Sequence, residues 1–315
     1  MDRDIINIEN TNRCTAKCVI CPREKFTQKL DSMDFELYKK IIDDASQYNI
    51  KTLDMCGYGE PFIDKRLAEL LHYAKQKIKG VQTYISTTCW FEDKYNALDY
   101  IDILKISFYG MTPETYKRMH NQIQTWPLLN ILEILSRTKK PYTIGLFVKT
   151  DINKHETMDW IKFWEPRFDE IMVWKPHNWV DYRNYRTVDK TKQVSCGRPL
   201  KGPLYIHTDG KVSPCCWDIN KRLLIGDMNT QTIAEVFNSD AFKRIQEAHL
   251  KNDFTGLICA ECDQTNPDPS SLICSSNKER KVGMLTPNME ELIKNQKDLD
   301  PKFSKLINEH FWKLI

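Results

Sequence analysis

Three cysteines near the start of the sequence share one short stretch: Cys14, Cys18 and Cys21. Their C-x3-C-x2-C spacing lets a single loop present three thiolates, which hold three irons of a 4Fe-4S cube and leave the fourth iron open to a ligand. Structural zinc also takes closely spaced thiolates, but it normally needs four protein ligands. This loop offers three, and no histidine lies nearby. The spacing therefore favours an iron-sulfur cluster over zinc.

A glycine-containing loop follows the second strand-like run of the sequence. Residues 52–56 are strand-like, and the next five residues are Gly57, Tyr58, Gly59, Glu60 and Pro61. Glycine permits close backbone approach to a ligand. Taken alone, Gly-Glu-Pro is more often an ordinary turn, but here it lies one strand and one helix after the three cysteines. Together the two motifs resemble the signatures of the radical S-adenosylmethionine (radical SAM) enzymes.

This resemblance implies a cofactor and a chemistry. In radical SAM enzymes the amino and carboxylate groups of SAM chelate the open iron, and SAM is cleaved reductively to a 5'-deoxyadenosyl radical that takes a hydrogen atom from the substrate. The resemblance implies SAM contacts at Ile20, where the family usually has an aromatic residue, at Gly57, Tyr58, Gly59 and Glu60, and at the strand residues Ser86, Thr88, Ser107 and Val148. For the strand residues an ordinary structural role is the alternative.

Apolar runs alternate with amphipathic helical patterns through roughly the first 180 residues. The strand-like runs are 5–9, 52–56, 82–87, 103–109, 143–148 and 170–175, and the helical patterns include 35–48, 66–77, 113–119 and 128–138. Such alternation predicts an α/β fold with a parallel sheet and helices outside it. Six units match the partial (β/α)6 barrel of radical SAM enzymes. Both motifs then fall at the carboxyl ends of the strands, where ligands bind in such folds.

A second group of cysteines follows a polar, aperiodic stretch at 181–195. Cys196, Gly210 and Cys215 follow the pattern C-x13-G-x4-C, and Cys259 and Cys262 form a C-x2-C pair. Gly210 predicts a tight hairpin that presents Cys215 beside Cys196. The order resembles the start of the SPASM module, and more closely its shortened twitch form. That resemblance implies that the four cysteines hold a second, auxiliary 4Fe-4S cluster, and a zinc-ribbon-like site is the alternative.

The remaining cysteines Cys56, Cys89 and Cys216 are expected to be buried thiols rather than ligands. Cys274 could be either, and a non-ligand role is favoured. We expect three parts along the chain: a radical SAM partial barrel at 1–184, a smaller cysteine-rich twitch/SPASM-like domain at 185–280, and a helical C-terminal tail at 281–315. Residues 303–315 have apolar side chains at helical spacing, which predicts an amphipathic helix that docks on the barrel.

The charge balance and the apolar content of the chain limit which partners and which cellular compartment we expect. The chain has 46 basic and 43 acidic residues, a balance that argues against nucleic-acid binding by bulk electrostatics. It has no run of 18 apolar residues, so we expect no membrane span. The 13 residues before Cys14 do not form a secretion signal. We therefore expect a cytoplasmic protein, in which eleven cysteines act as metal ligands or buried thiols.

The auxiliary cluster bears on the reaction, because a cluster near the barrel mouth can accept an electron from a substrate radical. Oxidation of an alcohol then also needs a base, and the candidates are Tyr109, Lys149, Lys175 and His177. We expect dehydrogenation or epimerisation of a small polyol, such as a sugar, an aminocyclitol or a nucleotide sugar. Flavodoxin or ferredoxin is the expected external electron donor.

Two alternatives stay open for the function. One is a maturase that modifies a ribosomal peptide, and the other is a zinc-stabilised binding protein without enzymatic activity. The small-molecule hypothesis leads because many peptide maturases carry a recognition domain that has no room before Cys14. The cysteine pattern also accounts for one auxiliary cluster rather than two.

Overall fold

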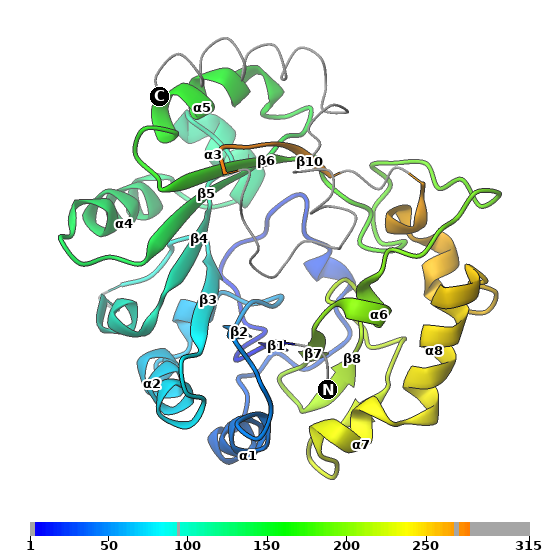
Figure 1. Cartoon of the computed structure of the whole chain (residues 1–315). Coiled ribbons are helices and arrows are strands. Elements are labelled where there is room, and N and C mark those ends of the chain that lie inside the picture. The colour runs from blue at the N-terminus through cyan, green and yellow to red at the C-terminus, as the bar shows by residue number, and fades with distance from the viewer. Residues whose placement is uncertain (1–3, 93–94, 268–270, 278–315) are drawn as a thin grey trace.

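A ten-stranded sheet that curls into an unclosed barrel forms the centre of the fold, as the computed structural model in Figure 1 shows. The structure describes residues 4–92, 95–267 and 271–277. The strand order is β10-β6-β5-β4-β3-β2-β1-β7-β8-β9. Strands β1 to β6 lie side by side in chain order and pair in parallel. The predicted α/β partial barrel is confirmed.

The six barrel strands lie within two residues of their predicted bounds. They are β1 (Ile5–Ile8), β2 (Thr52–Asp54), β3 (Gln82–Thr87), β4 (Ile103–Ser107), β5 (Tyr142–Val148) and β6 (Glu170–Trp174). The connecting helices are α1 (Phe35–Ala45), α2 (Leu67–Lys77), α3 (Pro113–His120), α4 (Thr125–Ser136) and α5 (Thr157–Trp164). Short 3-10 helices cover Arg23–Lys25, Pro61–Ile63, Tyr95–Tyr100, Lys154–Glu156, Ile258–Glu261 and Asp263–Thr265.

Local sequence signals set the ends of these helices. Asp34 caps α1, since its carboxylate accepts hydrogen bonds from the backbone N–H groups of Glu36 and Leu37 at 2.9 and 3.1 Å. Thr112 caps α3, which begins with a proline at its first position. Asn121 ends α3 in the left-handed conformation that is common at helix C-termini, with a φ of 53°. The C-terminus of α3 is therefore well defined.

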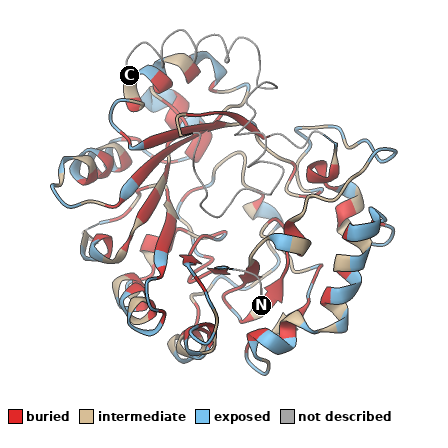
Figure 2. Cartoon of the chain, in the orientation of Figure 1, coloured by how far each residue is buried: buried red, intermediate tan, exposed pale blue. Residues whose placement is uncertain are grey.

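The two faces of the parallel sheet differ because side chains alternate along a strand. Leu53, Leu104 and Phe147 are fully buried in the main apolar core, together with residues of the surrounding helices. Their strand neighbours Asp54 and Lys105 line a cavity inside the barrel instead. Figure 2 shows the buried strands and the exposed outer faces of the helices. The inner face of the barrel therefore carries these polar groups beside apolar residues such as Leu146 and Met172.

The cysteine-rich region extends the same sheet. Strand β7 (Leu204–Ile206) pairs in parallel with β1, and β8 (Lys211–Ser213) and β9 (Gly226–Asp227) follow in antiparallel order. Gly210 forms the predicted hairpin turn, with a φ of 82°. Strand β10 (Leu272–Ser275), which the sequence did not predict, pairs antiparallel with β6 at the other edge. Helices α6 (Arg198–Lys201), α7 (Ile233–Phe237) and α8 (Asp240–Lys251) complete this region.

Three further expectations from the sequence concern the C-terminal tail, membrane spans and the domain boundary. The tail at 281–315, with its predicted helix, lies outside the described residues. Within the described residues no helix is both long and apolar enough to cross a membrane. The division into domains at residue 184 stays a prediction, and the sheet itself continues from β1 to β7 across that boundary.

Glu9 links three segments at the end of β1. It is fully buried, its backbone N–H donates to the Ile206 carbonyl at 2.9 Å, and its Oε1 accepts from the Tyr58 N–H at 2.8 Å. Burial raises the pKa of Glu9 from 4.5 to about 7, against hydrogen bonds that lower it. The folded chain therefore holds a proton on this carboxyl that the unfolded chain releases between about pH 4.5 and 7.

We therefore expect Glu9 to make the protein less stable as the pH rises through that window. Glu9→Gln carries no titrating proton and keeps an oxygen to accept from Tyr58. Relative to the wild type, the variant should gain on the order of 2–3 kcal/mol of unfolding free energy between pH 5 and 8. Anaerobic urea unfolding at several pH values measures this difference. Parallel pH curves for the two proteins would contradict it.

Candidate active site

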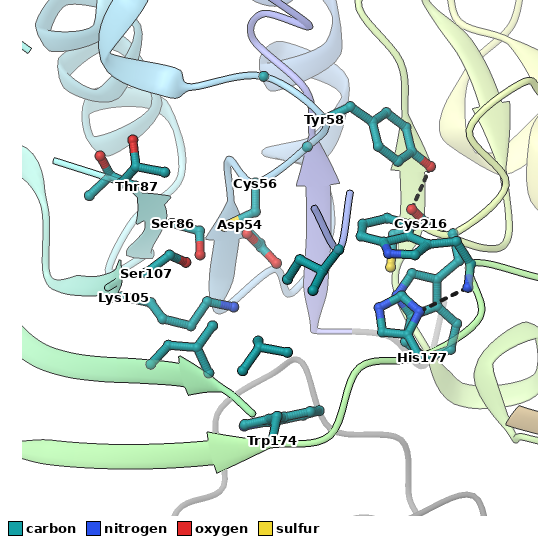
Figure 3. A pocket seen from close by; sticks show the side chains of 18 of the residues that line it. Asp54, Cys56, Tyr58, Ser86, Thr87, Lys105, Ser107, Trp174, His177 and Cys216 are labelled. Atoms are coloured by element: carbon teal, nitrogen blue, oxygen red, sulfur yellow. Dashed lines mark hydrogen bonds between the residues drawn. The ribbon is translucent and has the colours of Figure 1, made fainter. Parts of the chain in front are cut away.

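One cavity of about 290 Å³ occupies the inside of the barrel and its mouth. Its wall comes from the cysteine loop, the 57–60 loop, the inner face of β1 to β6, the residues directly after β6 and parts of the cysteine-rich region between Arg198 and Trp217. All nine predicted SAM contacts line it: Ile20, Gly57, Tyr58, Gly59, Glu60, Ser86, Thr88, Ser107 and Val148. Figure 3 shows several of these side chains with Lys105 and Trp174 around the same space. The assignment of these residues to SAM stays a prediction.

The 57–60 loop packs against the segment that precedes the first cysteine. A side chain on Gly59 would place its Cβ 2.1 Å from the Thr11 carbonyl oxygen, and one on Gly57 would collide with Glu9 and Tyr205. The backbone N–H of Glu60 donates to the Arg13 carbonyl at 2.8 Å. The missing side chains thus face protein, which is a different reason for glycine from the ligand approach inferred from the sequence.

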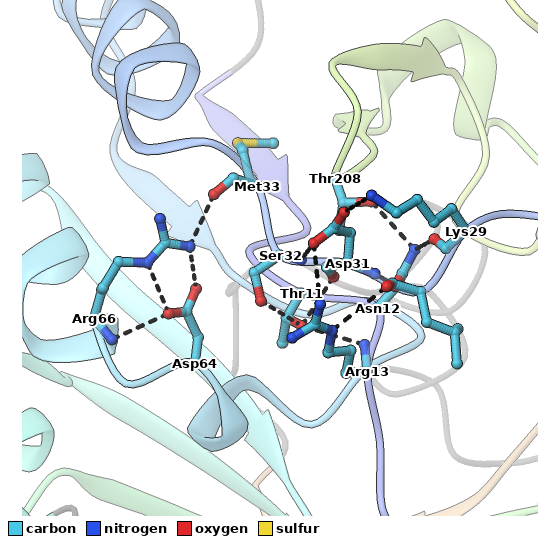
Figure 4. Close-up of polar contacts among 11 residues, drawn as sticks. Thr11, Asn12, Arg13, Lys29, Asp31, Ser32, Met33, Asp64, Arg66 and Thr208 are labelled. Atoms are coloured by element: carbon cyan, nitrogen blue, oxygen red, sulfur yellow. Dashed lines mark hydrogen bonds and ion pairs between the residues drawn. The ribbon is translucent and has the colours of Figure 1, made fainter.

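The segment before Cys14 is fixed from its other side by a polar network (Figure 4). The Asn12 amide donates to the Lys29 carbonyl at 2.9 Å and to the Thr208 hydroxyl at 3.2 Å, and its oxygen accepts from the Asp31 N–H at 2.7 Å. Arg13 pairs with the Asp31 carboxylate at 3.2 Å. These bonds hold the backbone directly before the cysteine loop.

Glu60 uses both carboxylate oxygens within the protein. Oε1 accepts from the Thr87 hydroxyl at 2.6 Å, and Oε2 accepts from the Thr88 N–H and hydroxyl at 2.7 and 2.8 Å. Burial raises its pKa above the usual value. The carboxylate therefore positions the end of β3 at the cavity wall, and its contact with SAM stays a prediction.

The three thiols of the cysteine loop lie close enough to affect one another. Burial raises the pKa of Cys14 to about 12, with a further increase from Glu60 and Cys21. Burial also raises the pKa of Cys18, and the other two thiols add to that shift. Thiolates in such a place need a cationic partner, which the irons of a cluster provide. Among the described residues no three side chains converge as they would on a single metal ion. The donor set fits a cluster held at its corners.

His120 contacts this loop from the end of α3. Its Nε2 accepts a hydrogen bond from the Tyr109 N–H at 3.1 Å, so the neutral ring carries its proton on Nδ1. Nδ1 lies 3.3 Å from the Cys18 Sγ and donates to it. The ring stacks between Tyr109 and Tyr116, with centroid distances of 4.5 and 4.4 Å. His120 is thus held as a donor to a predicted cluster ligand.

The four predicted auxiliary ligands meet around a second, smaller cavity. Cys196, Cys215, Cys259 and Cys262 all line it, together with Arg198 and Trp217. Burial raises the pKa of Cys259 to about 12, and Cys196 adds to the shift. These residues fit a four-thiolate group. Cys216 instead lines the larger cavity, where its carbonyl accepts from the Tyr58 hydroxyl, and Cys274 is buried in β10.

Three of the four predicted acid–base candidates line the larger cavity: Tyr109, Lys175 and His177. Lys149 is not among its lining residues in the described part of the chain, and its charge acts on Cys274 instead. Burial lowers the pKa of His177 to about 3, with help from two nearby arginines. Its Nδ1 accepts from the Trp179 N–H at 3.2 Å, so the neutral ring presents an Nε2–H donor. Burial raises the pKa of Tyr109, which keeps the phenol protonated.

The sequence reasoning missed Asn7, Asp54, Lys105 and Arg198, all of which line the larger cavity. For Asp54 and Lys105 a signal existed, because a charged residue interrupts an apolar strand run in each case. For Arg198 and His120 no sequence signal was available, since their contacts come from segments far apart in the chain.

The fold and the site combine an α/β partial barrel with two groups of cysteines, beside two cavities that share Arg198 and Trp217 as lining residues. The family model of the radical SAM superfamily matches residues 8–163, and that of the SPASM iron-sulfur cluster-binding domain matches residues 196–263. The chain therefore belongs to the radical SAM superfamily and carries a C-terminal SPASM domain. Its cofactors are SAM, a SAM-binding 4Fe-4S cluster and an auxiliary cluster, as the sequence predicted.

Solved structures share this fold at low identity. BtrN in complex with AdoMet and 2-DOIA is 17% identical, with a TM-score of 0.58 over 84% of this chain and 94% of that one. SuiB of Streptococcus suis, bound to precursor peptide SuiA, is 13% identical, with a TM-score of 0.62 over 78% and 66%. The enzyme anSMEcpe with bound AdoMet is 13% identical, with a TM-score of 0.63 over 96% and 98%. At these identities the likeness concerns the fold alone.

A curated relative is the tungsten-containing aldehyde ferredoxin oxidoreductase cofactor-modifying protein of Pyrococcus furiosus. It is 31% identical over 81 residues, which is 25% of this chain. The match spans 22% of the length of that relative.

We expect His120 to raise the reduction potential of the SAM-binding cluster, because a hydrogen bond to a ligand sulfur stabilises the reduced, more negative state. His120→Phe preserves the stacking ring but removes the donor, so the potential should fall. Redox titration followed by EPR measures it, and His120→Gln, which keeps an N–H donor, should recover part of the shift. The exposed His72→Phe serves as control. An unchanged potential in His120→Phe would count against this role.

Proposed function

We propose that the protein is a radical SAM oxidoreductase that dehydrogenates or epimerises a small polyol, such as a sugar, an aminocyclitol or a nucleotide sugar. The main observation behind this proposal is that one cavity is lined both by the predicted SAM contacts and by residues of the cysteine-rich region. Its volume is about 290 Å³, and SAM and the substrate would share that space.

When bound, SAM and the clusters supply a 5'-deoxyadenosyl radical for hydrogen-atom abstraction and an acceptor for the electron that a dehydrogenation releases. The protein's part is to hold SAM and substrate in one enclosed space. The backbone of the 57–60 loop and the ends of β3, β4 and β5 would hold SAM. Ile20 offers an apolar contact in place of the usual aromatic one.

The shared wall between the two cavities supports a dehydrogenation. Arg198 and Trp217 line both cavities, and the guanidinium lies 4.7 Å from the centre of the indole ring. Arg198 is buried, and the thiolates of Cys215 and Cys216 raise its pKa although burial opposes the shift. A substrate in the larger cavity would therefore lie beside the auxiliary thiolates.

The three candidate acid–base residues that line the cavity differ in whether they can donate or accept a proton. His177 is neutral and presents an N–H, and Tyr109 stays protonated, so each is suited to donate a hydrogen bond rather than to accept a proton. Lys175 lies at the end of β6 in the same wall. We assign His177 and Tyr109 to substrate orientation and Lys175 to accepting the proton that the alcohol loses on oxidation.

A peptide maturase is the second candidate. Two of the structures that share the fold were solved with peptides, SuiB with precursor peptide SuiA and anSMEcpe with the Kp18Cys peptide. We rank this candidate second because the cysteine pattern accounts for one auxiliary cluster rather than two. Substrate screens with polyols and with short peptides separate the two.

Three further expectations belong to this proposal. Flavodoxin or ferredoxin would deliver the reducing electron, the enzyme would act in the cytoplasm, and nucleic acid would not be a partner. A zinc-stabilised binding protein would instead contain zinc and fail to cleave SAM, so metal analysis of anaerobically purified protein discriminates between the two.

We expect about eight irons per reconstituted chain, as two four-iron clusters give, and release of 5'-deoxyadenosine from SAM under reduction. The double variant Cys259→Ala/Cys262→Ala should retain about four irons and still cleave SAM, but it should lose substrate oxidation because the electron acceptor is gone. Iron analysis and chromatography of the products measure these effects.

Cys274→Ala provides the matched control, because this thiol is also buried in the C-terminal region but does not line the auxiliary cavity. It should keep about eight irons. An unchanged iron content in the double variant, or a loss of iron in the control, would show that the ligands are wrongly assigned.

A further inference from the structure

Three polar residues form a cluster inside the barrel that none of the predicted cofactor roles uses. Asn7, Asp54 and Lys105 come from β1, β2 and β4 and line the larger cavity. Asn7 and Asp54 are direct partners in the pairing of β1 with β2. Figure 3 shows the Lys105 ammonium and the Asp54 carboxylate pointing toward each other across the space. We call these three residues the inner polar cluster.

Two oxygens of this cluster are buried without a hydrogen-bond partner. The Oδ1 of Asn7 and the Oδ1 of Asp54 have none, although the residues are only 4% and 1% exposed. Buried acceptors are normally satisfied, because leaving one unpaired is destabilising. Two such oxygens on neighbouring strands, both in the wall of a cavity, indicate a ligand that brings hydrogen-bond donors.

The charges around the cluster favour an ionised carboxylate. Burial raises the pKa of Asp54 to about 6, while a hydrogen bond from Cys56, the Lys105 ammonium and a hydrogen bond from Asn7 oppose that increase. The carboxylate thus has protein partners, and its Oδ1 is the oxygen left for a ligand. Lys105 also lies 5.4 Å from the centre of the Tyr84 ring, which forms part of the same wall. Near neutral pH the cavity therefore offers a strong acceptor, a weaker amide acceptor and a cationic donor close together.

We propose that the inner polar cluster is the substrate subsite and that it binds adjacent hydroxyl groups of a polyhydroxylated ring. A hydroxyl group donates to the Asp54 or Asn7 oxygen and accepts from the Lys105 ammonium at the same time. An ionised carboxylate or a fully ionised phosphate has no proton to donate to the two acceptors, so this corner favours hydroxyl groups over such anions. This inference rests on the proposed function and names the part of the substrate that the barrel recognises.

The rest of the wall suits the same class of ligand. Leu146 and Met172 are buried on the inner face of β5 and β6, and Trp174 ends β6 beside them. Sugar and cyclitol rings combine an edge of hydroxyl groups with apolar C–H faces. One apolar wall and one polar wall match that distribution, as in other small-molecule sites.

The test uses reconstituted holoenzyme with SAM and dithionite, and it measures how far a probe raises 5'-deoxyadenosine formation above the basal rate. The probes are myo-inositol, 2-deoxystreptamine, glucose, UDP-glucose and a short peptide. With a carbon-deuterated form of the best polyol, deuterium should appear in 5'-deoxyadenosine. We expect stimulation by at least one polyol and not by the peptide.

Asp54→Asn keeps the shape of the side chain but loses the charged acceptor. The KM for the polyol should rise about tenfold to hundredfold, as expected for a lost hydrogen bond to a charged group. The KM for SAM and the iron content should stay within about twofold of the wild type, because the cluster does not take part in the predicted SAM contacts. Lys105→Met is a second variant with the same expectation.

Asp102→Asn is the matched control, since Asp102 is paired with Lys75 at 2.6 Å and lies just before β4, outside the cavity lining. It should leave the KM for the polyol unchanged. Normal polyol KM values in both Asp54→Asn and Lys105→Met, or SAM cleavage that no polyol stimulates in the wild type, would overturn the inference. A wild-type enzyme that cleaves no SAM at all would instead overturn the proposed function.

Discussion

The close backbone contact between the 57–60 loop and residues 11–13 is the constraint on which the rest of the site depends. Gly59 has no room for a side chain against the Thr11 carbonyl, and the Glu60 N–H donates to Arg13. Arg23 adds a clamp, because its guanidinium donates to the carbonyls of Asn12 and Tyr58. Cys14 follows Arg13 directly, so this contact sets where the cysteine loop begins relative to the strand ends. A single added methyl group would push apart the two motifs that define the family.

The two faces of the barrel sheet have different roles, since the outer face packs against the helices and the inner face lines the cavity. The outer face of each strand is apolar and packs under the helices, which supplies the hydrophobic burial that stabilises the fold. The inner face carries Asp54, Lys105 and Ser107 into a cavity. Polar groups there are destabilising unless they are paired, and the Oδ1 atoms of Asn7 and Asp54 have no hydrogen-bond partner. In the proposed substrate subsite, these two oxygens accept hydrogen bonds from the substrate.

The cysteine-rich region extends the sheet of the barrel and also contacts the 57–60 loop. Strand β7 pairs with β1, and Tyr58 of the 57–60 loop donates to the carbonyl of Cys216. Arg198 and Trp217 form a wall that the two cavities share. The predicted auxiliary cysteines therefore lie next to the larger cavity, and the pairing of β7 with β1 joins their region to the barrel. Under the proposed function, this arrangement would bring both clusters near one substrate.

The sequence by itself determined the chemistry-bearing motifs and the strand order of the barrel. The spacing of Cys14, Cys18 and Cys21 and the strand–helix alternation are local patterns, and local patterns are readable without a structure. The predicted SAM contacts and auxiliary cysteines were brought together as expected, while the antiparallel β10, the pairing of β7 with β1, the His120 donor to Cys18 and the inner polar cluster were not foreseen. Each of these depends on segments far apart in the chain. Only the tertiary structure decided them, because long-range pairing and the burial of a polar group follow from how whole elements pack, and no local pattern records that.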